Sequence, residues 1–264
     1  MRSVNVDGGT LNVFERGAGP AVVFVHGYPL NHTMWRAQLA ALPNNRLIAP
    51  DMRGFGRSTV TEGTVTMEQM ADDLAAVLDA LAIRQPVCLC GLSMGGYIAL
   101  QFLRKYLDRV RSLVLCDTRS VADTPEAAAA RRQAADKVTV DGVAPIAEAM
   151  LPKLLHHTAD EHVKQAVRDM ILSTDPRGVA AALRGMALRP DSSDLLGTID
   201  VRTLVLVGEH DAISPPDEMR KIAAAIPHAQ FVVVPGAGHM APMENAPVVN
   251  EALAAFLADE LHAR

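Results

Sequence analysis

The chain has 264 residues, of which 49% are hydrophobic, 21% charged and 4% aromatic. These values are those of an ordinary globular protein, so they exclude disordered, collagen-like and fibrous classes. A chain of this length makes one or two domains and can bury a core without disulfide or metal support. The formal net charge is −5, and basic residues run no longer than pairs such as Arg131-Arg132. We therefore expect no nucleic-acid partner, because no basic stripe could follow a phosphate backbone.

The sequence also argues against a membrane partner. No apolar run approaches the roughly 18 residues that a membrane span needs. The first nine residues lack the apolar core of a signal peptide, which predicts a cytoplasmic protein. Cys88, Cys90 and Cys116 lie within apolar runs. They are interpreted as buried reduced thiols, because their spacing is not that of a redox or zinc pair.

Strand-like runs and helical patterns alternate along the chain. Segments 3–6 and 11–15 flank Asp7-Gly8-Gly9, which predicts an antiparallel hairpin at one edge. Six continuously apolar runs then follow, which is typical of strands covered on both faces. These runs are 21–25, 46–49, 87–90, 112–116, 203–207 and 230–234.

Helix start signals lie between these runs. Thr66 and Gln69 form a capping box ahead of apolar residues at helical spacing. Ser214-Pro215-Pro216-Asp217 offers an N-cap followed by a proline, and a last helix is expected over 247–261. The alternation predicts an α/β fold with a mostly parallel twisted sheet and helices on both faces.

Residues 119–197 interrupt the alternation, because they contain no strand-like run. Their pattern predicts several helices, with starts near Thr124-Pro125, Thr158 and Asp175-Pro176. A segment this long between two strands is too long for a loop. We therefore predict a helical cap at 119–197, inserted into a core formed by 1–118 and 198–264.

The sequence Gly91-Leu92-Ser93-Met94-Gly95-Gly96 follows the run 87–90 and opens a helical pattern over 94–106. A serine at a sharp turn from strand to helix needs small residues two positions away on either side, because the backbones crowd there. Gly91 and Gly95 meet this need. The turn also directs the helix N-terminus at the reacting carbon. Ser93 is therefore the candidate nucleophile.

A serine nucleophile needs a base at the same edge of the sheet. His239, in Gly236-Ala237-Gly238-His239, comes directly after the run 230–234 and is the candidate. His228 precedes that run and so belongs to the opposite edge. His262 lies in the last helix, and His26 is interpreted as shaping a loop beside Gly27.

An acid must orient the base. Asp211 follows the run 203–207 and is preferred, and Asp117, which follows 112–116, is the rival. Asp51 is interpreted as holding the turn at 53–56. The order Ser93, Asp211, His239 matches the chain order of a triad built on such a sheet.

The oxyanion of an acyl-transfer reaction needs at least two hydrogen-bond donors. The backbone N–H of Met94, at the helix start, is one candidate. The second is expected in the loop after 21–25, where Pro29 has no N–H and Tyr28 is therefore preferred. No cofactor and no metal is needed, because the nucleophile, the base and the donors are all groups of the protein.

These motifs resemble those of the α/β-hydrolase superfamily, close to its small cofactor-free esterases, enol-lactonases and perhydrolases. The matching segments, in family order over nearly the whole chain, are His26-Gly27-Tyr28-Pro29, 51–58, 91–96, Gly208-Glu209-His210-Asp211 and 236–239. The resemblance implies a helical cap over 119–197. It also implies Ser93 as nucleophile, Asp211 as acid, His239 as base, and Tyr28 with Met94 as oxyanion donors. A serine at the turn differs from the aspartate of dehalogenases and epoxide hydrolases and from the cysteine of the dienelactone type.

The predicted function is hydrolysis of a small carboxylic ester or lactone through an acyl-enzyme on Ser93. A general esterase is the first interpretation, and a lactonase of aromatic catabolism resembling 3-oxoadipate enol-lactonase is the second. Perhydrolysis, an acyltransferase and a non-catalytic hydrolase-fold receptor stay open as alternatives. The fold alone does not fix the substrate, and a monomer and a homo-oligomer are equally compatible with the sequence.

Two further features of 119–197 have alternative interpretations. The segment 156–162 contains three histidines, as a metal site would, but Thr158 and Glu161 form a capping box, so we interpret it as a solvated helix. Met150, Met170 and Met186 could line a pocket for an acyl group, but packing against the sheet is the preferred interpretation for each of them.

Overall fold

Within residues 1–262, which the computed structural model describes (side chains through 258), eight strands form one sheet in the order β1-β2-β4-β3-β5-β6-β7-β8. The strands are β1 (Arg2–Val6), β2 (Gly9–Arg16), β3 (Ala21–Val25), β4 (Arg46–Pro50), β5 (Val87–Leu92), β6 (Val110–Cys116), β7 (Arg202–Gly208) and β8 (Gln230–Val234). The β1–β2 hairpin lies at one edge and pairs antiparallel with β4, whereas β3 to β8 are parallel. The predicted fold class and hairpin are confirmed.

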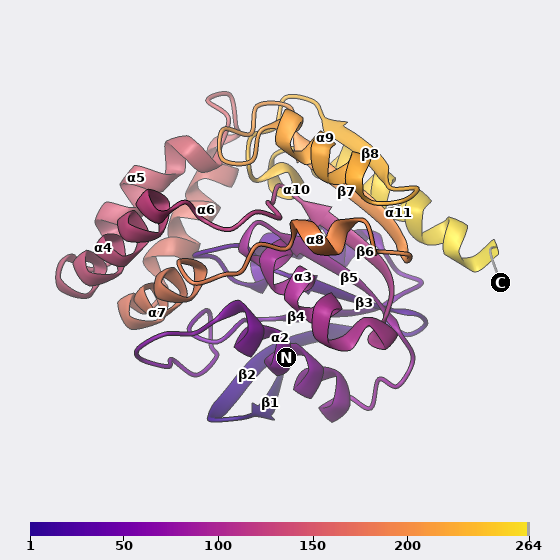
Figure 1. Ribbon diagram of the computed structural model, residues 1–264, viewed down its shortest axis with the longest axis horizontal. Helices are drawn as coiled ribbons and strands as arrows, with labels where there is room; N and C mark the ends of the chain where they lie inside the picture. The colour runs from indigo at the N-terminus through magenta and orange to yellow at the C-terminus, as the bar shows by residue number, and fades with distance from the viewer. Residues whose placement is uncertain (263–264) are drawn as a thin grey trace.

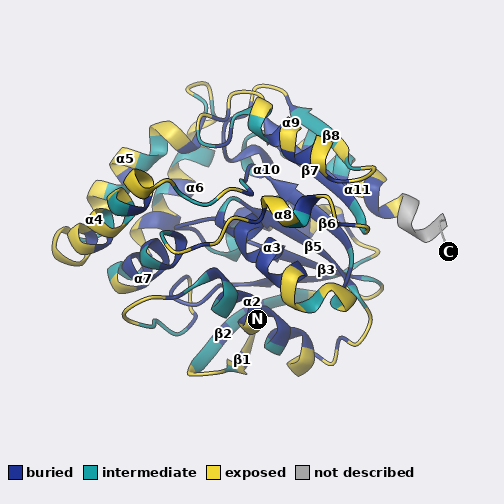
Figure 2. Ribbon diagram, in the orientation of Figure 1, coloured by how far each residue is buried: buried dark blue, intermediate teal, exposed yellow. Residues whose placement is uncertain are grey.

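The central strands are buried on both faces, which explains their continuously apolar sequences (Figure 2). In β3, Val23 and Val25 belong to one apolar core, and Val22 and Phe24 belong to a second core on the other face. Helices α2 (Met67–Ala80), α3 (Met94–Tyr106) and α9 (Pro216–Ala225) supply the first core, and α1 (Arg36–Ala41) and α11 (Ala246–His262) supply the second. Among the described residues, no helix is both long and apolar enough to cross a bilayer.

The helix starts follow the predicted signals with one shift in the core. The Thr66 side chain accepts a hydrogen bond from the Gln69 N–H at 3.2 Å and caps α2. Helix α9 begins at Pro216, one residue later than predicted, with Pro215 at the N-cap position. The three cysteines Cys88, Cys90 and Cys116 are buried thiols, as expected.

The chain between β6 and β7 is helical, and we call residues 119–197 the cap segment. Its helices are α4 (Pro125–Asp141), α5 (Ala144–Leu154), α6 (Glu161–Leu172), α7 (Pro176–Met186) and the short α8 (Ser193–Leu196). Helices α4 to α7 gather at one side of the molecule, opposite α11 (Figure 1). The division of the chain into a core and an inserted cap stays a prediction.

One predicted helix start in the cap segment is wrong. Thr124 and Asp175 cap α4 and α7 as expected, but Thr158 does not cap α6. Asp160 does so, because its carboxylate accepts the His162 N–H at 2.7 Å. The Thr158 hydroxyl instead pairs with the His156 ring at 2.7 Å. The Asp160 carboxylate, one residue before α6, thus takes the capping position that was predicted for the Thr158 hydroxyl, three residues before α6.

Helix α7 fixes the cap segment to the core through backbone contacts. The Val65 N–H donates to Ala181 O at 3.1 Å. A Cβ at Gly178 would lie 2.1 Å from Gly54 O, and one at Gly185 would lie 1.7 Å from Val65 O. The two glycines therefore allow the helix to lie directly on the core loop that contains residues 54–65.

Candidate active site

Ser93 lies in a strained turn between β5 and α3. Its backbone has φ 54° and ψ −114°, a sparsely populated combination for a residue other than glycine. Hydrogen bonds to its backbone N–H and carbonyl hold it there. The Ser93 N–H donates to Cys116 O at 3.0 Å, and Ser93 O accepts from the Gly96 N–H at 2.9 Å and from the Thr118 hydroxyl at 2.7 Å. The surrounding structure thus fixes a conformation that the serine would not adopt by itself.

The glycines on either side of Ser93 are needed for close backbone approach. A Cβ at Gly91 would lie 2.3 Å from Gly95 O, and a Cβ at Gly95 would lie 2.2 Å from Val25 O. Both distances are far below any real Cβ contact. This crowding explains why small residues stand at these two positions of the motif.

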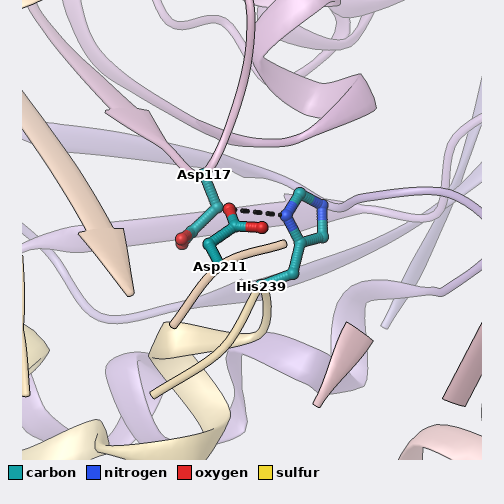
Figure 3. A group of neighbouring side chains, drawn as sticks. All are labelled: Asp117, Asp211 and His239. Atoms are coloured by element: carbon teal, nitrogen blue, oxygen red, sulfur yellow. Dashed lines mark hydrogen bonds and ion pairs between the residues drawn. The ribbon is translucent and has the colours of Figure 1, made fainter. Parts of the chain in front are cut away.

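His239 and Asp211 form a buried hydrogen-bonded pair (Figure 3). His239 follows β8 and Asp211 follows β7, and their side chains are 1% and 0% exposed. The imidazole Nδ1–H donates to Asp211 Oδ2 at 2.8 Å, and Asp211 Oδ1 accepts from the Ile213 and Ser214 N–H groups. Burial raises the pKa of Asp211, but these hydrogen bonds outweigh it and lower that pKa overall. With Nδ1 donating, Nε2 is the ring nitrogen that can accept a proton.

Asp117, the rival acid, lies beside Asp211 but does not bond His239. It follows β6, and its Oδ1 accepts the Gly208 N–H at 2.8 Å. Complete burial raises the pKa of Asp117 well above its usual range, and the charge of Asp211 raises it further. Both effects favour the protonated form of Asp117.

The same three residues form the group that could hold a metal within the described part of the chain. Ligand atoms of Asp117, Asp211 and His239 all lie within 4.8 Å of one another (Figure 3). The His239–Asp211 hydrogen bond already occupies one atom of each of these two residues. This bonding is that of a base and its orienting acid.

The backbone of Ser93 is hydrogen-bonded to the residue that follows Asp117, a member of this group. Its carbonyl accepts from Thr118, the residue after Asp117, and Asp117 lies beside Asp211 and His239. Among the described residues, no hydrogen bond joins the Ser93 hydroxyl to His239. The contact between the Ser93 hydroxyl and the base His239 therefore stays a prediction.

The two expected oxyanion donors flank Ser93. Met94 is the first residue of α3, where the N–H groups have no acceptor within the helix. The loop containing Tyr28 lies against the turn, because a Cβ at Gly27 would be 3.5 Å from Ser93 Cβ. The Tyr28 hydroxyl is buried without a partner among the described residues, and burial raises its pKa. The donor roles of Tyr28 and Met94 stay predictions.

The other candidates occupy structural positions. His26 is buried and bridges two loops: its Nε2 accepts the Met52 N–H and its Nδ1 pairs with Gly27 O, both at 2.9 Å. Burial lowers the pKa of His26 to about 4, so the ring is neutral. Asp51 holds the turn, since it accepts the Arg57 N–H at 3.1 Å. His228 lies in a turn ahead of β8, and the His262 side chain is outside the described residues.

The sequence analysis missed Glu244, which ends α10 (Ala241–Glu244) five residues after His239. Its carboxylate accepts backbone hydrogen bonds from Gly238 and Met240, the two neighbours of His239. A signal existed, because Glu244 is an acidic residue that directly follows the apolar residues 240–243.

The sheet order, the strained serine turn and the His239–Asp211 pair together define an α/β hydrolase. The chain belongs to the alpha/beta hydrolase fold family, whose model matches residues 20–246.

Solved structures and curated proteins give more specific likenesses. A thermophilic esterase from Thermogutta terrifontis with malate bound is 47% identical, with a TM-score of 0.96 over 98% of both chains. An enol-lactonase from Burkholderia xenovorans LB400 is 30% identical, with a TM-score of 0.89 over 97% of this chain and 100% of that one. The 3-oxoadipate enol-lactonase 1 of Acinetobacter baylyi is 29% identical over 91% of this chain and 90% of its own length.

Proposed function

We propose that the chain is a serine hydrolase that cleaves a small carboxylic ester or lactone through an acyl-enzyme on Ser93. The observation that carries the proposal is the buried hydrogen bond from His239 to Asp211 at the sheet edge where the Ser93 turn lies. The similarity to an esterase and to two enol-lactonases supports the same substrate class.

The proposed reaction has two acyl-transfer steps. In the first, His239 Nε2 takes the hydroxyl proton as Ser93 Oγ attacks the carbonyl carbon. The Met94 and Tyr28 N–H groups stabilise the oxyanion, and His239 returns the proton to the departing alkoxide oxygen. In the second, His239 deprotonates a water molecule that attacks the acyl-enzyme, which releases the acid and restores the Ser93 hydroxyl.

Ser93→Ala tests the nucleophile. We expect hydrolysis of a chromogenic short-chain ester to fall by about 10⁴-fold or more, because no oxygen remains to form the acyl-enzyme. A fluorophosphonate probe should label the natural chain and not the variant. Ser3→Ala, on the exposed strand β1, is the matched control and should keep full activity. A Ser93→Ala variant that keeps more than about a thousandth of the rate would contradict the proposal.

The same assays separate the alternatives. A folded chain that binds a ligand tightly but is not labelled would be a receptor of the hydrolase fold. A panel of esters and lactones of varied chain length distinguishes esterase from lactonase. Parallel measurement of acyl transfer to water and to peroxide distinguishes a hydrolase from a perhydrolase.

A further inference from the structure

The carboxylate of Glu244 accepts hydrogen bonds from the backbone on both sides of His239. Its Oε1 accepts the Gly238 N–H at 3.0 Å and the Met240 N–H at 3.1 Å. Its Oε2 accepts the N–H of His156, in the cap segment, at 2.7 Å. One side chain thus binds the backbone immediately before and immediately after the imidazole, and it binds the cap segment as well.

The loop around His239 also touches the cap segment directly. The Met240 N–H donates to Leu154 O at 3.2 Å, and a Cβ at Gly238 would lie 2.7 Å from His156 N. The His156 ring stacks on that of His210, the residue before Asp211, at 4.2 Å and 18°. The end of α5 therefore packs against the backbone that carries the base and the acid.

The short helix that carries Glu244 is anchored to the core. Gln38 is fully buried, and its Nε2 donates to Pro242 O and to Asn250 Oδ1, both at 3.0 Å. Pro242 lies within α10. The carboxylate of Glu244 is thus held from the core side while it binds the loop and the cap segment.

The charge of Glu244 also acts on His239. Burial raises the pKa of Glu244, while the three backbone donors and the electrostatic interaction with His239 oppose that rise. The charged or titratable groups that face the imidazole are Asp211 after β7, Asp117 after β6 and Glu244 on α10.

We propose that Glu244 is a positioning residue for His239: it fixes the backbone on both sides of the imidazole and joins that loop to the cap segment at His156. This inference rests on the proposed function, in which His239 is the base. A displacement of a catalytic group by about 1 Å can lower a rate about 100-fold. The three hydrogen bonds of Glu244 oppose such a displacement.

Two variants of Glu244 separate the parts of this role. Glu244→Ala removes all three hydrogen bonds, and we expect kcat to fall by about 100-fold with a smaller change in KM. Glu244→Gln keeps the volume but offers one acceptor oxygen. Its NH₂ group must therefore face the N–H of either the loop or the cap segment. We expect a smaller loss of kcat in this variant.

Glu209→Gln is the matched control. Glu209 also caps the loop, because its Oε2 accepts the Gly236 N–H at 2.9 Å, but this carboxylate is exposed and binds neither neighbour of His239. We expect its kcat to stay within about 2-fold of the natural chain, as for an ordinary surface substitution.

The split between kcat and KM supplies a readout that a merely structural role would not move. A displaced base lowers kcat while KM stays nearly unchanged, and the glutamine variant, which keeps part of the hydrogen bonding, should recover part of the kcat lost in the alanine variant. Folded Glu244 variants with unchanged kcat would overturn the proposal; if the alanine variant does not fold, the glutamine variant decides. If the natural chain neither hydrolyses esters nor labels at Ser93, the proposed function itself fails, which is a separate outcome.

Discussion

Asp117 lies beside Asp211 at the ends of two neighbouring strands, but of the two carboxyls only Asp211 accepts a hydrogen bond from His239 (Figure 3). Two buried carboxyls this close do not both ionise. The hydrogen bond from His239 lowers the pKa of Asp211 against its burial, whereas burial and the neighbouring charge raise the pKa of Asp117. The pKa values of the two carboxyls thus shift in opposite directions, and the protonated form is favoured at Asp117 alone of the two.

Asp211→Asn and Asp117→Asn should have unequal effects on catalysis. Asp211→Asn replaces the acceptor of the His239 bond with an amide, which disturbs the tautomer of the ring, and we expect kcat to fall by about 10⁴-fold. Asp117→Asn is isosteric with a neutral carboxyl and should keep kcat within about tenfold of the natural chain. Steady-state kinetics on one ester measures both. A larger loss in Asp117→Asn than in Asp211→Asn would make Asp117 the acid.

Asp117→Asn should also stabilise the fold increasingly with pH. An aspartate whose folded pKa is raised binds its proton more tightly in the folded state than in the unfolded state. Its contribution to stability is therefore lost as the pH rises from about 4, the ordinary aspartate pKa, towards the folded pKa. The asparagine has no such dependence. Urea unfolding at pH 5 and pH 8 checks this, and a stability difference that shrinks between the two would contradict a neutral Asp117.

The core sheet was predictable because its signals are local. Continuous apolar runs give buried parallel strands, and Asp7-Gly8-Gly9 gives the hairpin. The serine turn was also predictable, because the turn leaves no room for a Cβ at two positions, and the sequence has Gly91 and Gly95 there. Residues whose role depends on distant partners were less predictable. Asp117 and Asp211 both follow strands; the order of the motifs favoured Asp211, and the hydrogen bond with His239 separates the two in space.

Glu244 and α6 show the same limit. The partners of Glu244 include His156, which is 88 positions away and comes into contact only when the cap segment packs on the core. Thr158 and Asp160 both offer an oxygen ahead of α6, and the sequence rule for a capping box favours the wrong one. In the structure, the oxygen that accepts a free N–H at the start of α6 is that of Asp160.

Gly178→Ala should separate α7 from the core. The added Cβ would meet Gly54 O at 2.1 Å, and a backbone carbonyl cannot turn aside as a flexible side chain can. We expect a loss of about 3 kcal/mol in the free energy of unfolding, at the upper end of the cost of overpacking. Thermal and urea unfolding measure it. Gly197→Ala is the matched control, because its Cβ meets nothing within 4 Å, and it should be tolerated.

Asp123→Asn should destabilise the chain more than Arg189→Met. Asp123 and Arg189 are 6% and 4% exposed, and Asp123 binds Arg189 through one oxygen and Arg131 through the other, both at 2.6 Å. Arg189 also donates to Val121 O and Met186 O, so it joins the two ends of the cap segment, and it stacks on Tyr97 of α3 at 4.4 Å.

The reason for this difference is the charge that each variant leaves behind. Asp123→Asn leaves Arg189 and Arg131 together without a carboxylate, which for a buried pair costs about 3–5 kcal/mol. Arg189→Met leaves Asp123 paired with Arg131, so we expect a smaller loss. Arg177→Ala, which removes exposed pairs with Asp175 and Glu62, should change stability little, because solvent screens exposed ion pairs. Urea unfolding of the three variants gives the order, and equal losses from Asp123→Asn and Arg177→Ala would show that solvent screens the Asp123 cluster.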